Sequence, residues 1–282
     1  MDPSVAPVLK WVGGKRQVLD VLIPMLPQNI STYCEPFVGG GAMLFKLQPA
    51  KAYVNDINTD LIRVYDIIKN DVEALISALQ EFKNEAGFYY AVREWDRNKA
   101  KYSSLSDIKK AARTIYLNKT CYNGLFRVNS AGEFNSPFGN YRNPNIVNAY
   151  TLRAVSSYLN SATICLTSND YAHFLQNIQN LFLKQKDTFV YLDPPYDPVS
   201  DTSNFTGYTK GGFSRQEQVR LKECCDQLHK QKFKFMLSNS ATEFIKELYA
   251  NYHITIVRAK RAINSNAKKR GEVDEVVIRN YI

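Results

Sequence analysis

Short apolar runs, bounded by polar or glycine-rich segments, recur near the start of the chain and throughout its second half. They are a few residues long and rich in β-branched and aromatic side chains, a pattern typical of buried strands. One strand begins near Ser31 and leads into a glycine loop. The pattern predicts further strands at Ala52–Val54, Ala162–Leu166, Thr188–Leu192 and Phe233–Leu237, and two closing strands at Ile254–Arg258 and Val273–Asn280.

Residues 61 to about 120 follow a helical pattern instead. Ile108, Ala111, Ala112 and Ile115 have the i, i+3, i+4, i+7 spacing of one buried helix face. The segment predicts helices at Leu61–Lys69, Val72–Asn84, Phe88–Lys101 and Ser106–Lys119. Asn123-Gly124 ends the pattern, and Leu125–Asn129 and Glu133–Asn135 predict a β-hairpin around Ser130–Gly132. Later, Ser214 and Glu217 form a capping box that opens a helix to about Lys230.

Strands that alternate with helices on both sides of a helical middle predict a doubly wound, Rossmann-like α/β fold with an inserted domain. We assign residues 1–60 and 145–282 to the α/β domain. Residues 61–144 form the insert, which is mostly helical and carries the β-hairpin. The hairpin contains Arg127 and several amides, groups that can read base edges. A hairpin with a merely exposed arginine is the alternative.

Charge and composition narrow the class of partner. The net charge of +9 suggests a polyanion, and 18 Tyr and 15 Phe provide rings that could stack on bases, although a basic balance also serves ordinary solubility. Basic residues crowd one predicted loop: Arg258, Lys260, Arg261, Lys268, Lys269 and Arg270. No apolar stretch approaches the roughly 18 residues of a membrane span, and the N-terminus lacks the order of a signal peptide.

Cysteine and histidine usage gives no sign of a metal site. The five cysteines contain no CxxC pair, and the three histidines are scattered, so we predict reduced thiols and no metal. These features indicate a cytoplasmic protein with no membrane partner.

The glycine loop has the organisation of a nucleotide-binding unit. Glu35-Pro36-Phe37-Val38-Gly39-Gly40-Gly41 follows the first strand and precedes a helix, and Asp56 follows the second strand. Glycines let the backbone approach a ligand, and an acid at this position suits ribose hydroxyls. The loop is neither GxGxxG nor GxxxxGK[ST], which disfavours dinucleotide and P-loop interpretations.

The tetrapeptide Asp193-Pro194-Pro195-Tyr196 is the most informative motif. Its two prolines cannot continue the preceding strand, so the four residues lie at a strand's carboxyl end, where open α/β sheets bind ligands. A carboxylate and a proline carbonyl can accept hydrogen bonds from an amino group while the tyrosine stacks on a ring. The motif therefore fits a flat ligand that bears an amino group. The alternative is a Pro-Pro turn with a solvated aspartate.

With these motifs in order, the chain resembles the Dam-type DNA adenine-N6 methyltransferases, the alpha group of amino-methyltransferases. The matching blocks cover nearly the whole chain: Leu9–Lys15, Glu35–Gly41, Asn55–Asp56, Tyr122–Asn129, Gly132–Gly139, Asp193–Tyr196, Leu237–Asn239, and the late Arg261 with Ser265–Asn266. Their order is that of the alpha group, with the cofactor loop first, then the recognition insert, then the catalytic tetrapeptide. Asn169-Asp170-Tyr171 departs from the family's usual Gly-Asp-Phe.

The resemblance implies an AdoMet-dependent methyltransferase fold and methylation of a flipped-out adenine in duplex DNA, within GATC, including by enzymes of restriction–modification systems. The implied cofactor is S-adenosyl-L-methionine (AdoMet), bound by Trp11, Lys15, Phe37, Gly39, Gly41, Asp56, Asp170, Tyr171 and Asp193. The implied catalytic residues are Asp193, Pro194, Pro195 and Tyr196. The implied DNA-binding residues are Lys10, Tyr122, Asn123, Leu125, Arg127, Pro137, Tyr141, Lys268 and Lys269.

Other interpretations stay open at the level of sequence. An RNA adenine-N6 or a DNA cytosine-N4 methyltransferase would use a similar tetrapeptide. A DNA-binding protein without catalysis could keep the same scaffold, but the intact Asp193, Tyr196 and glycine loop disfavour it. The resemblance implies a bacterial or phage-encoded, nucleoid-associated protein that acts as a monomer, with a weak dimer as the alternative.

Overall fold

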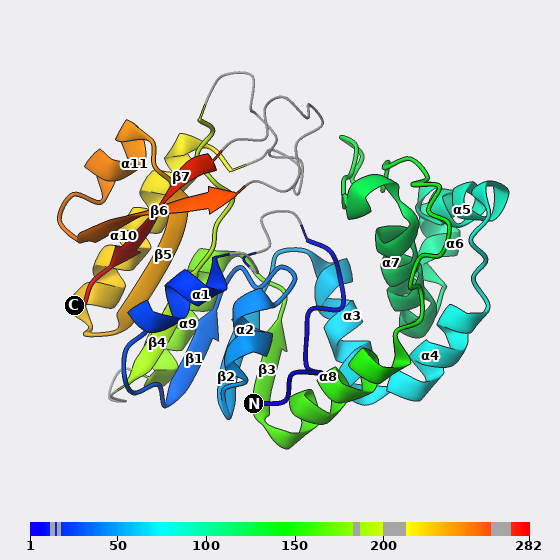
Figure 1. Cartoon of the computed structure of the whole chain (residues 1–282), viewed down its shortest axis with the longest axis horizontal. Helices are drawn as coiled ribbons and strands as arrows, with labels where there is room; N and C mark the ends of the chain where they lie inside the picture. The colour runs from blue at the N-terminus through cyan, green and yellow to red at the C-terminus, as the bar shows by residue number, and fades with distance from the viewer. Residues whose placement is uncertain (12–14, 16–17, 183–186, 200–212, 261–271) are drawn as a thin grey trace.

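A seven-stranded sheet forms the centre of the α/β domain (Figure 1). The computed structural model describes residues 1–11, 15, 18–182, 187–199, 213–260 and 272–282. Across the sheet the order is β3 (Thr163–Thr167), β2 (Lys51–Asn55), β1 (Thr32–Glu35), β4 (Thr188–Leu192), β5 (Lys234–Ser240), β7 (Glu272–Arg279) and β6 (His253–Lys260). The first five are parallel, and β7 runs antiparallel to both its neighbours. The predicted doubly wound, Rossmann-like α/β sheet is confirmed.

Helices cover both faces of the sheet, and the alternation of side chains along each strand divides the core in two. Tyr33 and Tyr191 belong to the core of one face, and their neighbours Cys34 and Val190 to the core of the other. Helices α1 (Leu19–Leu22), α2 (Ala42–Leu47), α3 (Thr59–Asn70) and α8 (Ala149–Ser161) pack into the first core; α9 (Tyr171–Phe182), α10 (Arg215–Lys230) and α11 (Glu243–Leu248) pack into the second. Strand β4 is buried along its whole length, as expected for a strand covered on both faces.

The connections reverse direction between β1 and β4. From β1 the chain steps outward to β2 and β3, whereas from β4 it steps the opposite way to β5. The carboxyl ends of β1 and β4 therefore flank a topological switch point, where open α/β sheets bind ligands. Glu35 ends β1, and Asp193 directly follows β4.

The helical part lies to one side of the sheet, at the right of Figure 1. It comprises α4 (Val72–Gln80), α5 (Ala86–Arg93), the 3-10 turn η3 (Glu94–Arg97), α6 (Lys99–Ser103), α7 (Asp107–Thr120) and the turn η4 (Tyr122–Gly124). Tyr89, Tyr116, Phe126 and Phe134 contribute to a separate core that joins α5 and α7 to the hairpin region.

The predicted continuous helix Phe88–Lys101 is wrong. The chain leaves the α conformation at Glu94, where the 3-10 turn buries Asp96. The Asp96 carboxylate forms an ion pair with Arg113 (2.8 Å) and accepts a hydrogen bond from the Phe134 backbone N–H (2.9 Å). These tertiary partners satisfy a buried charge, and a sequence pattern does not reveal them.

The predicted hairpin is present in a minimal form. Val128 and Phe134 form an isolated antiparallel bridge. Backbone hydrogen bonds flank it, from Asn129 N–H to Glu133 C=O and from Asn135 N–H to Arg127 C=O, both 2.9 Å. The two arms pair as predicted, but they are too short to count as strands.

Candidate active site and DNA-binding surface

Four side chains from three distant segments meet beside the end of β4. The Lys15 ammonium lies 3.1 Å from Asp193 Oδ1 and 3.8 Å from Glu275 Oε2. It also lies 4.2 Å from the centroid of the Tyr196 ring. The Tyr196 hydroxyl donates a hydrogen bond to Glu275 Oε2 at 2.9 Å. Two carboxylates, one ammonium and one aromatic ring thus form a single cluster, in which Lys15 is almost fully buried.

The surroundings of Asp193 tune its proton affinity. Burial raises the pKa of Asp193 to about 6, the Lys15 ammonium opposes this rise, and the charge of Glu275 adds to it. Asp193 is therefore a carboxylate at neutral pH and can act as a hydrogen-bond acceptor. Burial and the two nearby carboxylates hold the pKa of Tyr196 well above its ordinary value, so its hydroxyl remains a donor.

Two buried amide side chains, one from α10 and one from β5, hold the tetrapeptide and the residue that follows it in place. The Pro195 carbonyl accepts a hydrogen bond from Gln218 Nε2 of α10 at 2.9 Å. Asn239, at the end of β5, donates to Gln218 Oε1 at 3.0 Å and accepts from the Asp197 N–H at 3.0 Å. Both amide side chains are fully buried. Since Pro195 binds Gln218, Pro194 is the better candidate for the carbonyl that accepts from a substrate.

The glycine loop has a backbone shape that suits glycine and leaves little room for side chains. Gly39 and Gly41 have positive φ angles of +47° and +69°. A Cβ at position 39 would lie 2.9 Å from the Trp11 indole, and one at position 41 would lie 2.7 Å from Phe45. The Trp11 ring therefore packs directly on the loop.

Asp56 holds this loop from the next strand. Its Oδ2 accepts from the Gly39 N–H and its Oδ1 from the Asn58 N–H, each at 2.9 Å. Burial raises the pKa of Asp56 to about 6, and the two backbone hydrogen bonds oppose that rise. The residue is thus ionised at neutral pH, and each oxygen keeps lone-pair capacity for a further donor.

The remaining predicted cofactor residues follow β1 and β3, and their two aromatic rings pack into the second core of the sheet. The rings of Phe37 and Tyr171 are 5.1 Å apart. Asp170 accepts from the Ala172 N–H at 3.0 Å and from Arg220 at 2.8 Å. The Tyr171 hydroxyl donates to the Glu217 carboxylate at 2.9 Å, so the predicted capping-box acid also anchors this ring. Asp170 therefore already has protein partners in a half-exposed position.

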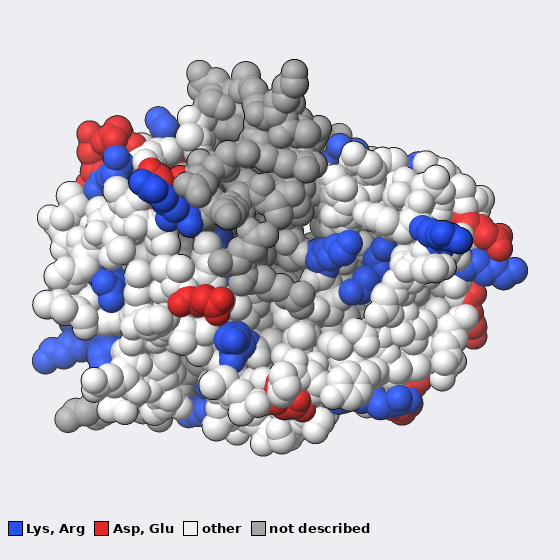
Figure 2. All heavy atoms as spheres, viewed as in Figure 1, with Lys and Arg blue, Asp and Glu red and all other residues white. Residues whose placement is uncertain are grey.

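Several predicted DNA-binding residues form one continuous surface. The buried Asn118 side chain bonds both the N–H and the C=O of Lys10, at 2.9 and 2.7 Å. The Lys10 side chain crosses Gly124, and its ammonium lies 5.3 Å from the Tyr141 ring centroid. Tyr122 N–H donates to the Pro137 C=O at 2.9 Å. Figure 2 shows several basic side chains on the visible face of the helical part, at the right of the view.

Arg127 is held by the opposite arm of the hairpin. Its Nε donates to Asn135 Oδ1 at 2.7 Å and its Nη2 to the Asn135 carbonyl at 3.3 Å. The hairpin is also joined to the glycine loop, since Phe126 stacks on Trp11 with ring centroids 5.1 Å apart. Trp11 therefore contacts both the predicted cofactor loop and the hairpin that is predicted to recognise the DNA sequence.

Comparison with known proteins decides the family. The model of the D12 class N6 adenine-specific DNA methyltransferases matches residues 11–263. The chain belongs to this family. A type II methyltransferase, M.MjaIII of Methanocaldococcus jannaschii, is 42% identical over 99% of this chain and 100% of its own length. The type II methyltransferase M1.LlaDCHI of Lactococcus lactis subsp. cremoris is 39% identical over 99% and 96%. The DNA adenine methylase of Escherichia coli K12 is 34% identical over 95% and 93%.

Family membership confirms the predicted adenine-specific DNA methyltransferase, so DNA is its substrate. Lys268 and Lys269 of this methyltransferase lie outside the described residues. Among the residues that the structure describes, no group of histidine, cysteine or acidic side chains could hold a metal ion. No described helix is long and apolar enough to cross a membrane.

Three functional candidates in the methyltransferase escaped sequence reasoning. Gln218 and Asn118 are polar residues on helix faces, which usually point to solvent, and here they are fully buried. Glu275 lies 79 positions from Tyr196 in the chain. A signal for Gln218 and Asn118 could have come only from their places on otherwise apolar helix faces.

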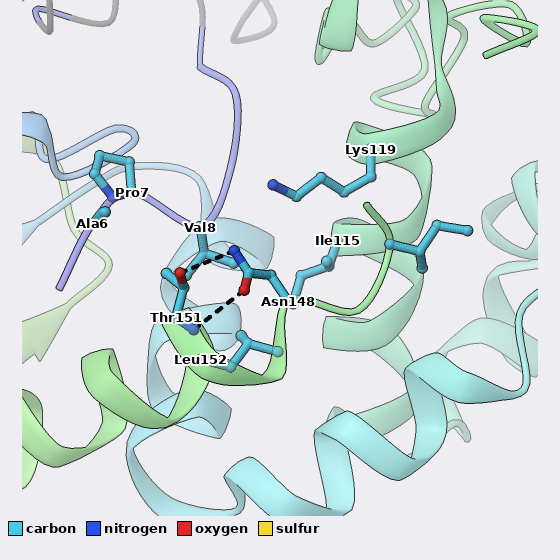
Figure 3. A pocket seen from close by; sticks show the side chains of 9 residues that line it. Ala6, Pro7, Val8, Ile115, Lys119, Asn148, Thr151 and Leu152 are labelled. Atoms are coloured by element: carbon cyan, nitrogen blue, oxygen red, sulfur yellow. Dashed lines mark hydrogen bonds between the residues drawn. The ribbon is translucent and has the colours of Figure 1, made fainter. Parts of the chain in front are cut away.

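A cavity of about 210 Å³ lies apart from this site, between the N-terminal segment and the helices α7 and α8 (Figure 3). Its lining includes Pro7, Ile115, Lys119, Asn148 and Thr151. The side chain of Asn148 is the N-cap of α8 and binds Thr151. None of the predicted site residues lines the cavity.

Proposed function

We propose that this methyltransferase transfers the methyl group of AdoMet to N6 of a flipped-out adenine in duplex DNA, within the sequence GATC, and acts as a monomer. The cluster at the end of β4 carries the proposal. It combines an ionised carboxylate, Asp193, with the ring of Tyr196. Both lie at the carboxyl ends of the parallel strands, where the glycine loop also lies.

The glycine loop and its neighbours fit AdoMet. The positive φ angles of Gly39 and Gly41 give a backbone without Cβ atoms, to which a ligand can come close. The ionised Asp56 can accept hydrogen bonds from ribose hydroxyls. Trp11 and Phe37 offer aromatic faces, which attract cations. When bound, AdoMet supplies a methyl group on a positively charged sulfur.

Three further residues complete the proposed cofactor site. Lys15 lies against Asp193, so it borders both the cofactor and the substrate side of the pocket. Asp170 and the Tyr171 backbone would contact the cofactor's adenine. Because Asp170 also binds Arg220, its carboxylate would have to accept hydrogen bonds from Arg220 and from the adenine at the same time.

The tetrapeptide would then act on the target base. An adenine inside the duplex cannot be reached, and flipping it out costs a few kcal/mol. Tyr196 would stack on the extruded ring, while Asp193 and the Pro194 carbonyl would accept hydrogen bonds from N6. These bonds favour a pyramidal nitrogen whose lone pair is free to attack, and they stabilise the positive charge that develops on N6. Asp193 need not remove a proton before transfer.

The hairpin surface would read the sequence. The Arg127 fork can donate two hydrogen bonds to O6 and N7 of a guanine. Lys10, Tyr122, Asn123, Leu125, Pro137 and Tyr141 would contact or wedge the site, and Lys268 and Lys269 would bind phosphates. Phosphate contacts add affinity without sequence choice. The contact between Trp11 and Phe126 gives recognition and cofactor binding a shared support.

Expression in a bacterial host without adenine methylation tests the proposal. We expect sequencing of the host DNA to find N6-methyladenine at GATC on both strands, and none in the same host with an empty plasmid. Adenine methylation at another sequence would reject GATC but keep the reaction. Methylation at cytosine N4, or in RNA alone, would reject the proposed reaction itself.

A further inference from the structure

Glu275 lies in the proposed methyl-transfer pocket although it belongs to none of the sequence motifs. It lies on β7, where it pairs with Ser240 of β5 and Val257 of β6. Its side chain is only 17% exposed. Oε2 of this one carboxylate accepts from the Tyr196 hydroxyl at 2.9 Å and lies 3.8 Å from the Lys15 ammonium.

This contact gives the hydroxyl of Tyr196 a task that stacking alone does not require. A phenylalanine would offer a similar aromatic face to a base, but it could not be held at its far end. The tyrosine ring is fixed at the backbone by the rigid Pro-Pro segment and at Oη by Glu275. The two anchors fix the long axis of the ring, and because a phenolic O–H prefers the ring plane, the hydrogen bond to Glu275 also restrains the rotation of the ring about that axis before any substrate arrives.

The orientation of that plane matters for the proposed reaction. A base stacked on Tyr196 takes its tilt from the ring, and its tilt decides whether the N6 lone pair points at the methyl group. A misplacement of about 1 Å can reduce a rate roughly 100-fold. The same carboxylate also faces Lys15, which contacts both Asp193 and the tyrosine ring. Glu275 thus binds Tyr196 directly and lies beside Lys15, the partner of Asp193.

We propose that Glu275 is a positioning residue of the methyl-transfer site, which acts by anchoring the Tyr196 hydroxyl and so the ring on which the target adenine stacks. The proposal rests on the proposed function of the tetrapeptide. It assigns β7, the antiparallel strand of the sheet, a part in catalysis through its contact with the end of β4.

The test compares four variants of the full chain, and a fifth as a control, in single-turnover methyl transfer to a GATC duplex. We expect Glu275→Ala to slow transfer about 10- to 100-fold. Tyr196→Phe should show a similar loss, and the double variant should be no slower than Glu275→Ala. Glu275→Gln keeps an acceptor for the hydroxyl and should stay within about threefold of the wild type at neutral pH. Asp274→Ala is the matched control, since it removes an exposed carboxylate from the next position of β7.

A second readout separates positioning from damage to the fold. With 2-aminopurine at the target position, we expect the partly quenched fluorescence of a flipped base stacked on Tyr196 in the wild type and a changed signal in Glu275→Ala, at unchanged thermal melting and AdoMet affinity. Transfer by Glu275→Ala within twofold of the wild type would overturn the proposal. So would full activity of Tyr196→Phe, or losses that multiply in the double variant. A wild type that methylates no DNA would instead reject the proposed function.

Discussion

At the scale of single residues, the ionisation of Asp193 sets the expected pH dependence. Because burial raises the pKa of Asp193 to about 6, the carboxyl gains its proton as the pH falls through 6 and ceases to be a full acceptor. At saturating AdoMet and DNA, we expect the single-turnover rate to be level between about pH 7 and 8 and to fall about tenfold per pH unit well below 6.

The charged groups near Asp193 predict how the acid limb of the pH–rate profile, the fall in rate below about pH 6, shifts in variants. Glu275 raises the pKa of Asp193 and Lys15 lowers it, so Glu275→Gln should move the acid limb to lower pH. Burial also holds the pKa of the neighbouring Glu35 well above its ordinary value. Saturating AdoMet is needed because Asp56 titrates in the same range. A rate that stays constant down to pH 5, or a limb that moves upward in Glu275→Gln, would contradict the account.

The residues that the sequence pattern predicts without the family resemblance are those that lie close together in the chain or at the ends of neighbouring strands. Asp193 and Tyr196 share one tetrapeptide, and Asp56 directly follows a strand next to the glycine loop. The strand order makes them neighbours with little further information. Glu275 could not be predicted, because its contact with Tyr196 depends on how an antiparallel strand joins the sheet 79 positions later. The proposed roles of the site residues remain predictions.

At the scale of elements, the hairpin tests whether the insert reads sequence. Arg127→Ala should lose about 1–3 kcal/mol of discrimination at one base pair. We would measure kcat/KM on a GATC duplex and on every single-base variant of it. Arg127→Lys is the matched control, since it keeps the charge but not the fork, and we expect it to keep affinity while losing discrimination. Equal losses on every duplex would mean that Arg127 binds phosphate or stabilises the hairpin.

The elements themselves were largely predictable where local pattern decides. Strand β4 has the predicted bounds, and β2, β3 and β5 agree within a few residues. Helix α7 also agrees, because one face carries Ala111, Ala112 and Ile115 into the core. The prediction was wrong at Phe88–Lys101, where Asp96 breaks the helix to reach Arg113 and Phe134. That break depends on partners outside the segment, so no local pattern could reveal it.

At the scale of the whole molecule, distant segments converge on the N-terminal stretch. Asn118 binds Lys10 from 108 positions away, and Trp11 packs on both the glycine loop and Phe126. The fold class followed from the alternation of strands and helices, but this convergence did not. It places residues predicted for cofactor and for DNA on one continuous framework, which supports a single enzyme that binds both.

The most direct test of this account is methyl transfer by Asp193→Ala. Loss of one such acceptor should raise the barrier by about 3 kcal/mol or more, so the single-turnover rate on a GATC duplex should fall more than 100-fold. AdoMet affinity, measured by calorimetry, should largely survive, because the role that we propose for Asp193 is toward the amino group of the substrate. The wild type should yield N6-methyldeoxyadenosine in the digested duplex. A variant that keeps more than a tenth of the wild-type rate would contradict the assignment of Asp193 and, with it, of the site.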